Sequence, residues 1–456
     1  MFTIMSRLIN DIIKKGNLSI TDTKGEVLHF GDGTGKPVHV RITSTKWEKE
    51  IALDPALKLG EAYMEGGFIF EEGDIYQLLE IIFTSTGPIA DNKIWMRALN
   101  FLRTATKRFA QMNTLSRSSK NVQHHYDLSG ELYELFLDPD KQYSCAYFEH
   151  PNQSLAEAQL AKKRHLAAKL SIKPNEKLLD IGCGWGGLGL YMARFLQADV
   201  TGVTLSQEQY NIANKRSLEM GLQDKARFLL QDYRKLEDQF DKIVSVGMFE
   251  HVGVGHFAEY FQHTKRLLKP DGVFVLHSIG RMSVPGTTNP FIAKYIFPGG
   301  YIPALSEVIP LIEKAGFYIT DIEILRLHYA DTLRDWRIAF LKHWDEAKAL
   351  YDERFCRMWE FYLAASESAF RWQDIMVFQI QLAHKQDAVP LTRDYILKEE
   401  DRLRKIDHVE LKSEPASKPK KAVPKATAKT KVKTAAKTST TAKVKKTAKK
   451  KNNVKT

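Results

Sequence analysis

The sequence predicts an α/β fold with a mostly parallel, doubly wound sheet, preceded by a small α+β domain and followed by a disordered basic tail. Three observations lead to this prediction. Short apolar strand-like runs alternate with helical stretches from residue 122 to about 408. The first of these runs ends in a glycine-rich turn. After residue 412 the composition changes to Lys, Ala, Thr and Pro, with almost no bulky apolar side chain.

Residues 1–112 predict the small domain, which carries no visible catalytic constellation. Apolar residues at helical spacing from Ile4 to Ile13 predict a first helix, which we expect to pack on its own domain rather than on a membrane. Strand-like pieces at Glu26–Phe30 and Val38–Ile42 flank a glycine loop, which we interpret as a hairpin turn because no helix follows it. Leu53–Phe83 reads as mostly helical. A polar linker at residues 113–121 follows.

The central region, residues 122–408, contains strands that are separated by helices. Helices between successive strands serve as crossover connections, and such connections produce a parallel sheet. The predicted strands are Leu178–Ile181, Val200–Val203, Phe228–Leu230, Lys242–Val246 and Gly272–His277.

The basic character of the chain belongs to residues 409–456. The net charge is +12, but 15 lysines and no acidic residue lie between Lys418 and Lys455, which leaves −3 for the rest. This tail cannot bury a core, and we expect it to be disordered. It suits an anionic membrane surface or the phosphates of a nucleic acid, and composition does not separate these partners.

Composition also bounds the cellular setting. No run approaches the ~18 consecutive apolar residues of a membrane span, and the N-terminus lacks the order of a signal peptide. Cys145, Cys183 and Cys356 are too few and too scattered for a disulfide framework or a metal cage. We therefore expect a cytoplasmic, reduced protein without a metal.

The strongest local signal runs from Leu178 to Gly187, with the sequence LLDIGCGWGG. A strand enters a glycine-rich turn that opens the next helix, and Gly182, Gly184 and Gly186 permit a ligand to approach the backbone. NAD, FAD and S-adenosylmethionine all use such turns. Asp180 favours S-adenosylmethionine, because its carboxylate can meet the ammonium group of a methionine moiety. The run RLLKPDG at residues 266–272 before an apolar strand is typical of Rossmann-like methyltransferases.

The end of the second strand departs from the usual pattern, in which Asp or Glu holds the ribose hydroxyls. Thr204, Ser206 and Gln209 stand there instead. Ser206 and Gln209 have capping-box spacing, which alone could explain them. Alternatively, Thr204 and Gln209 replace the acid.

At this point the sequence resembles the cyclopropane-fatty-acid and mycolic-acid cyclopropane synthase family. The matching segments follow one another in order over about residues 122–383, and they include HHYDL at 124–128, QYSCAYF at 142–148, FEHVG at 249–253, LHSIG at 276–280, FPGGY at 297–301 and HYADTL at 328–333. Residues 1–112 resemble the extra domain of the phospholipid-acting members, which serves lipid binding or dimerisation. The resemblance implies a phospholipid substrate, a homodimer, and a peripheral position at the inner face of the membrane. It favours the functional interpretation of Thr204 and Gln209. It also implies cofactor contacts from Tyr143, Ser144, Gly182, Gly184, Thr204, Leu205, Gln209, Asp232 and Tyr233.

The reaction that the resemblance implies adds a methylene group across a cis double bond. An isolated alkene is a poor nucleophile, so the site must hold it against the sulfonium methyl group and exclude water. Methyl transfer leaves a carbocation that aromatic faces can stabilise, and a base must then remove a proton. The family places a bicarbonate ion here, at positions that match Cys145, Glu250, His277, Ile279 and Tyr329.

Two other functions stay open at this level. One is a fatty-acyl methyltransferase on the same fold, with a methyl-branched or methylene product. The other is a non-catalytic nucleic-acid or membrane binding protein that uses the tail. The intact glycines and the intact Glu250, His277 and Tyr329 argue against the latter. His251 and His256 are assigned to an exposed loop and receive no role.

Overall fold

The computed structural model describes residues 2–87 and 129–413. Backbone contacts divide the chain into Met1–Val409 and Glu410–Thr456. The predicted linker at 113–121 and nearly all of the predicted tail lie outside the described residues, although the last helix extends to Ser413. In the described part of the chain, no helix is both long and apolar enough to cross a membrane.

The N-terminal region forms a four-stranded sheet with the strand order β2-β1-β3-β4 and four helices. Its elements are α1 (Phe2–Ile12), β1 (Asn17–Thr21), β2 (Val27–Phe30), β3 (Pro37–Ile42), α2 (Thr45–Leu53), α3 (Pro55–Met64), β4 (Phe68–Glu72) and α4 (Ile75–Thr86). Alternating residues of β1 and β3, such as Leu18, Val38 and Val40, are buried, because one face of this sheet lies on the core.

The predicted hairpin in this region is wrong. β2 pairs antiparallel with β1, while β3 pairs parallel with β1 on its other side. The glycine loop at 31–35 therefore carries the chain across β1, and Asp32 holds it by accepting hydrogen bonds from the backbone N–H groups of Gly16 and Thr34. β4 also interrupts the segment Leu53–Phe83, which the sequence predicts as mostly helical.

The second sheet has seven strands in the order β10-β11-β9-β8-β5-β6-β7. The strands are β5 (Lys177–Ile181), β6 (Asp199–Thr204), β7 (Ala226–Leu230), β8 (Phe240–Val246), β9 (Leu268–Arg281), β10 (Tyr318–Leu325) and β11 (Ile375–Ala383). The five predicted strands are present and pair in parallel. β11 lies antiparallel between β9 and β10, which makes the sheet mostly parallel, as the sequence predicts.

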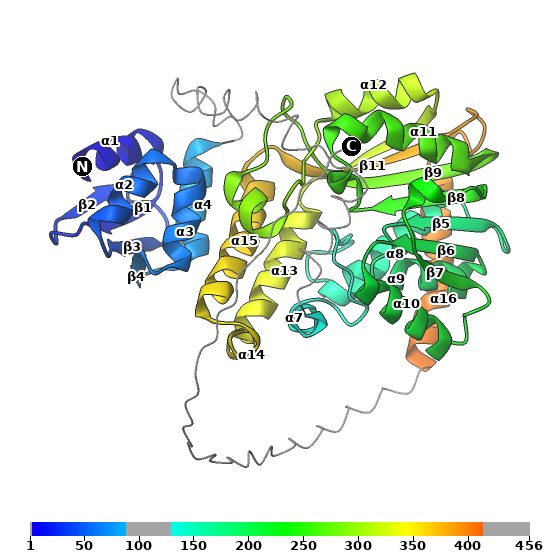
Figure 1. Cartoon of the computed structure of the whole chain (residues 1–456), viewed down its shortest axis with the longest axis horizontal. Coiled ribbons are helices and arrows are strands. Elements are labelled where there is room, and N and C mark those ends of the chain that lie inside the picture. Colours follow the sequence, from blue (N-terminus) through cyan, green and yellow to red (C-terminus); the bar gives the residue numbers. More distant parts are fainter. Residues whose placement is uncertain (1, 88–128, 414–456) are drawn as a thin grey trace, which may run out of the picture. The chain divides into compact units, whose positions relative to one another are not determined.

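Helices cover both faces of this sheet (Figure 1). One face packs against α8 (Leu155–Leu170), α9 (Gly187–Leu196), α10 (Gln207–Glu219) and α16 (Asp394–Ser413). The opposite face packs against α11 (Phe257–Leu267) and α12 (Leu305–Ala315). This arrangement is the doubly wound, Rossmann-like fold.

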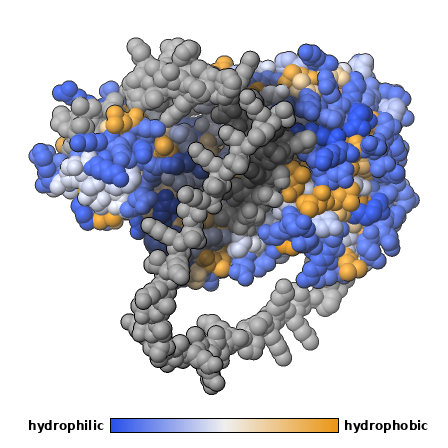
Figure 2. Space-filling view, viewed as in Figure 1, coloured by the Kyte–Doolittle hydropathy of each residue, from blue (hydrophilic) through white to orange (hydrophobic). Residues whose placement is uncertain are grey.

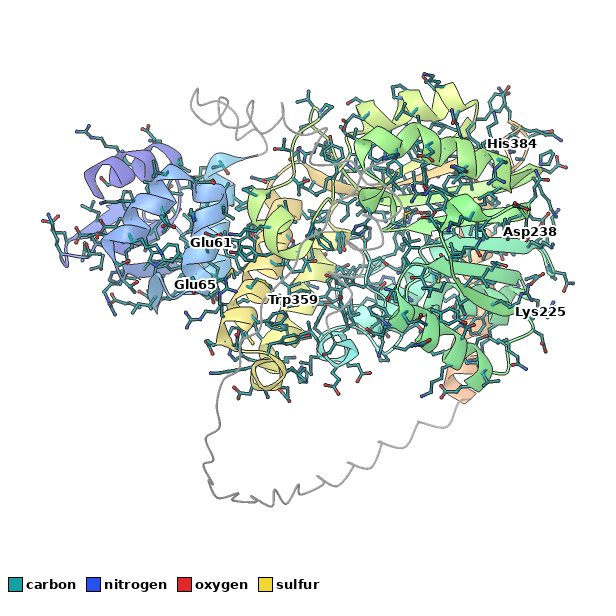
Figure 3. All side chains as sticks on the ribbon, in the orientation of Figure 1. Glu61, Glu65, Lys225, Asp238, Trp359 and His384 are labelled. Carbon is teal, nitrogen blue, oxygen red and sulfur yellow. The ribbon has the colours of Figure 1, made fainter. Side chains whose placement is uncertain are left out.

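The remaining helices build an apolar, aromatic-rich cluster. They are α7 (Gly130–Glu134), α13 (His328–Lys342), α14 (Trp344–Leu350) and α15 (Glu353–Trp372). Trp359, labelled on α15 in Figure 3, is almost fully buried and packs edge-on against Tyr362. On the outside, the face shown in Figure 2 is mainly hydrophilic, with separate hydrophobic patches.

Candidate functional site

A cavity opens beyond the carboxyl ends of β5, β6 and β8. Open α/β sheets bind ligands at this edge, at the point where helices leave adjacent strands toward opposite faces. Lys225 and Asp238, which precede β7 and β8, mark the other edge of the sheet (Figure 3). The residues lining the cavity include Gln142, Tyr143, Ser144, Asp180, Gly182, Cys183, Gly184, Trp185, Thr204, Leu205, Gln209, Asp232, Tyr233, Met248 and His251.

The glycine-rich turn has a backbone that other residues adopt poorly. Gly182 and Gly184 have φ angles of +79° and +54°. Across the turn, a Cβ atom on Gly202 would lie 2.5 Å from the ring of Phe228 and 2.9 Å from the Cβ of Cys183. The backbone of the turn is held to β6, because the N–H groups of Gly182 and Cys183 both donate to the carbonyl of Val203.

Asp180 supplies a carboxyl group at the end of β5. Its side chain is buried, and Oδ2 has no hydrogen-bond partner among the described residues. Burial raises its pKa to about 7, and the positive charge of Lys162 opposes that rise. A buried carboxyl with an unused oxygen on a cavity wall is suited to a cationic ligand group. The residues present therefore fit the ammonium end of S-adenosylmethionine.

At the end of β6, the sequence left two roles open: capping of the next helix and contact with the cofactor. The structure is compatible with both. The hydroxyl of Ser206 accepts a hydrogen bond from the backbone N–H of Gln209 and caps α10. Thr204 donates its hydroxyl proton to Oε1 of Gln209 at 2.7 Å, and both side chains line the cavity. Capping and a place in the site are thus compatible.

All predicted cofactor residues except Gly186 line this cavity. Gly186 is the N-cap of α9 with a φ of +82°, and a Cβ there would lie 2.9 Å from both Ala213 and Phe228. Close packing therefore explains why a glycine stands at this position.

Sequence reasoning missed several residues of the cavity wall, among them Gln142, Trp185 and Met248. The assignment of His251 to an exposed loop is wrong, because this side chain is half-buried and lines the cavity. Burial lowers its pKa to about 4, so the ring is neutral at pH 7. His256 is half-buried and faces Glu259, with 3.0 Å between Nδ1 and Oε2.

Glu250, one of the residues of the predicted anion site, lies against β9. Glu250 follows β8, and its Oε1 accepts a hydrogen bond of 2.6 Å from the N–H of Ile279. Oε2 is buried and has no partner of good geometry in the described chain. Burial raises the pKa of Glu250 to about 7, and the hydrogen bonds from the Ile279 N–H and the Ser278 hydroxyl oppose that rise. The group can thus hold or release a proton near neutral pH.

His277 lies two residues before Ile279 on β9 and is buried. Its Nδ1 is 3.1 Å from the amide nitrogen of Gln379, which can only donate. With the amide in this orientation, the proton of the neutral ring is on Nε2. Burial lowers the pKa of His277 well below its ordinary value, so the ring is a neutral hydrogen-bond donor.

The other three predicted anion-site residues share one apolar cluster. Cys145 is buried within it, and Ile279 and Tyr329 pack against it. Burial raises the pKa of the Cys145 thiol, which makes this cysteine a poor nucleophile. Tyr329 packs against Trp336, and Trp336 stacks on the cavity residue Tyr143 with 5.1 Å between ring centroids. This aromatic group connects Tyr329 with the wall of the cavity.

A cavity of this construction, at this point of a doubly wound sheet, is where S-adenosylmethionine-dependent methyltransferases bind their cofactor. The protein is an enzyme of that class, and comparisons with known proteins place it more narrowly. Residues 113–380 match the family model for mycolic acid cyclopropane synthetase. The chain belongs to this family. Residues 5–93 match a second model, a domain of unknown function.

Relatives and solved structures agree with this placement. The chain is 36% identical over 374 residues to the cyclopropane-fatty-acyl-phospholipid synthase of Escherichia coli K12, covering 82% of this chain and 92% of that protein. It is 42% identical over 337 residues to a probable fatty acid methyltransferase of Pseudomonas putida, covering 71% and 81%. Among solved structures, the mycolic acid cyclopropane synthase CmaA1 in complex with SAH and CTAB superposes with a TM-score of 0.56 at 35% identity, covering 58% of this chain and 97% of that one.

Proposed function

We propose that the protein transfers a methylene group from S-adenosylmethionine to the cis double bond of an unsaturated phospholipid acyl chain. The product is a cyclopropane fatty acyl chain, formed through a carbocation that is deprotonated by a bound bicarbonate ion. The extent of the match to the E. coli enzyme supports a phospholipid substrate, since 92% of that protein is covered. The match of residues 5–93 to a separate family model agrees with an additional N-terminal domain.

S-Adenosylmethionine supplies an electrophilic methyl group when it is bound. In the proposal, Asp180 holds its ammonium group, and Thr204, Gln209 and Asp232 hold its adenosine portion. The aromatic residues Tyr143, Trp336 and Tyr329 exclude water and present ring faces to the cation that develops on the acyl chain.

The buried Glu250 carries the proposal for ring closure. One of its oxygens is fixed by the Ile279 N–H, the other has no partner of good geometry in the described chain, and its pKa of about 7 suits proton transfer. A small anion fits beside it, because the Nε2–H of His277 and the hydroxyl of Tyr329 can both donate to an anion. Cys145, Ile279 and Tyr329 would complete the site that holds bicarbonate. Bicarbonate takes the proton that leaves the added methyl group, and ionised Glu250 then takes that proton from the carbonic acid that results.

The enzyme reaches its substrate as a peripheral membrane protein in this proposal, because acyl chains of phospholipids lie in the bilayer. The predicted basic tail at 409–456 would add attraction to anionic lipid.

Product analysis tests the proposal. The full-length protein is incubated with S-adenosylmethionine, bicarbonate and liposomes of cis-monounsaturated phospholipid, and the acyl chains are then examined by mass spectrometry and proton NMR. We expect a gain of one CH2, high-field ring protons and a loss of olefinic protons. Depleting bicarbonate should slow turnover.

Two matched variants show whether Glu250 acts as proposed. Glu250→Gln should abolish ring formation. Glu360→Gln makes the same change at a glutamate that is also 8% exposed but accepts its hydrogen bond from Tyr63 rather than from the Ile279 N–H, so it should retain turnover. Full activity of Glu250→Gln would overturn the assignment.

A second function is favoured by the relative from P. putida, whose name describes a probable fatty acid methyltransferase. In that case the same assay would give methyl-branch or exocyclic methylene signals without ring protons. No modification of any cis-unsaturated lipid, with the cofactor bound, would exclude both functions.

A further inference from the structure

Lys162 is a buried lysine next to the proposed cofactor cavity. It lies on α8 and is 1% exposed. Its Nζ donates hydrogen bonds to Oε1 of Gln142 at 2.7 Å and to Oγ of Ser144 at 2.8 Å. Both acceptors line the cavity, and neither is an anion. Burying an ammonium group without a carboxylate partner is costly, so its retention here requires an explanation.

Within the described chain, Lys162 makes no ion pair within 4 Å, unlike its neighbours on α8. Lys163 binds Asp140 at 2.7 Å, and Arg164 binds Asp407 at 2.9 Å. Burial lowers the pKa of Lys162 to about 8, and the more distant charge of Asp138 opposes the fall. At pH 7 the group is therefore mainly protonated, with part of its charge left uncompensated.

The hydrogen-bond pattern directs the Ser144 hydroxyl. Because Oγ accepts from Lys162, the serine O–H is left to donate elsewhere, and Ser144 stands on the cavity wall. Gln159 fixes the same strip of backbone, since its Nε2 donates to the carbonyls of Gln142 and Ser144 at 3.2 and 2.9 Å. Lys162 also lies close enough to Asp180 to lower the pKa of that carboxyl.

The amino-acid end of S-adenosylmethionine is a zwitterion, with an ammonium and a carboxylate on one carbon atom. A site for it needs an anionic group and a positively polarised donor side by side. Asp180 supplies the first. Ser144, polarised by Lys162, supplies the second.

We propose that Lys162 is a positioning residue for the cofactor, which holds Ser144 so that the serine hydroxyl donates to the α-carboxylate of S-adenosylmethionine. The inference rests on the cofactor use proposed above and adds a residue to it.

Two nucleosides separate this role from a structural one. S-Adenosylhomocysteine carries the amino-acid end, while 5′-methylthioadenosine keeps the adenosine and sulfur but lacks it. Binding of each to the full-length protein is measured by isothermal titration calorimetry at pH 7. We expect Lys162→Met to weaken S-adenosylhomocysteine about tenfold to hundredfold, the range for a hydrogen bond with a charged group. Binding of 5′-methylthioadenosine should change less than about twofold.

Lys169→Met is the matched control. Lys169 lies two turns along α8, is equally buried, and pairs with Glu323 rather than with a cavity residue. Its loss should leave the ratio of the two affinities unchanged. In a Ser144→Ala background, Lys162→Met should weaken S-adenosylhomocysteine far less than it does alone, because the serine is the group through which it acts.

Lys162→Gln serves as the second variant where the Met variant does not fold, and the same direction is expected. Equal weakening of both nucleosides, or no change in either, would overturn the role of Lys162. A wild-type protein that binds neither nucleoside would instead contradict the proposed cofactor.

Discussion

The raised pKa of Glu250 predicts that Glu250→Gln stabilises the protein while removing its activity. The folded state binds the proton of this carboxyl more tightly than the unfolded chain does, because the side chain is buried. Stability is therefore lost as the pH rises from 4.5, the ordinary pKa, to about 7. Each pKa unit corresponds to about 1.4 kcal/mol. The ionised group thus costs the folded state about 3 kcal/mol above pH 7.

Glutamine has the same shape, keeps the acceptor for the Ile279 N–H and does not ionise. The variant should gain up to about 3 kcal/mol over the wild type at pH 8 and nothing at pH 4.5. Urea titrations followed by tryptophan fluorescence at several pH values between these limits measure the difference.

Two control variants sharpen this measurement. Asp140→Asn should behave in the opposite way, because Lys163 and Arg216 hold the pKa of Asp140 at about 2 despite its burial. Its contribution is present above pH 4 and lost at lower pH, so the asparagine variant should be less stable at pH 7. Glu360→Gln should be stabilised at high pH like Glu250→Gln, since burial raises the pKa of Glu360 as well, yet it should keep activity. A pH-independent difference between the wild type and Glu250→Gln would refute the reasoning.

Three further changes test the fold around the site. Gly202→Ala places a Cβ 2.5 Å from the Phe228 ring; we expect a loss of about 1–3 kcal/mol in the unfolding free energy and weaker nucleoside binding by calorimetry. Asp407→Ala leaves Arg164 without its buried partner on α16, so thermal or urea unfolding should show a loss of about 3 kcal/mol. Removal of residues 414–456 should leave turnover on detergent-dispersed lipid within about twofold and weaken binding to anionic vesicles in a salt-dependent way; unchanged vesicle binding in a sedimentation assay would contradict a membrane role for the tail.

The parallel part of the sheet was predictable because its information is local. Each strand from β5 to β9 is a short segment that contains two or more bulky apolar residues, and the glycines after β5 have a backbone requirement that sequence displays. β10 and β11 escaped prediction because they pair antiparallel and β11 lies between β9 and β10, which the alternation of strands and helices does not indicate. The hairpin error has the same origin. β1 pairs with both β2 and β3, and nothing between residues 26 and 42 indicates that a third strand lies between them.

The residues of the site were also predictable to different degrees. Asp180 and the glycine turn follow from the residues themselves, whereas Glu250, His277 and Tyr329 were reached only through resemblance to a family. Lys162 gave no signal, because it stands within the run KKRH at residues 162–165, which reads as a solvated basic face. That face is in fact buried against acidic groups from distant segments, including Glu323, Glu400 and Asp407. Burial of a charged helix face depends on partners that no local pattern reveals.

Asp180 and Glu250 show how one physical device serves two tasks. Burial raises the pKa of each carboxyl to about 7, so both can change protonation state near neutral pH. A cationic ligand beside Asp180 would lower the pKa of that carboxyl and fix it as an anion. An anion beside Glu250 would raise the pKa of that carboxyl, so that it can take up the proton that ring closure releases. Binding of the two small groups would therefore separate the two carboxyls into a permanent anion and a proton carrier, as their proposed roles require.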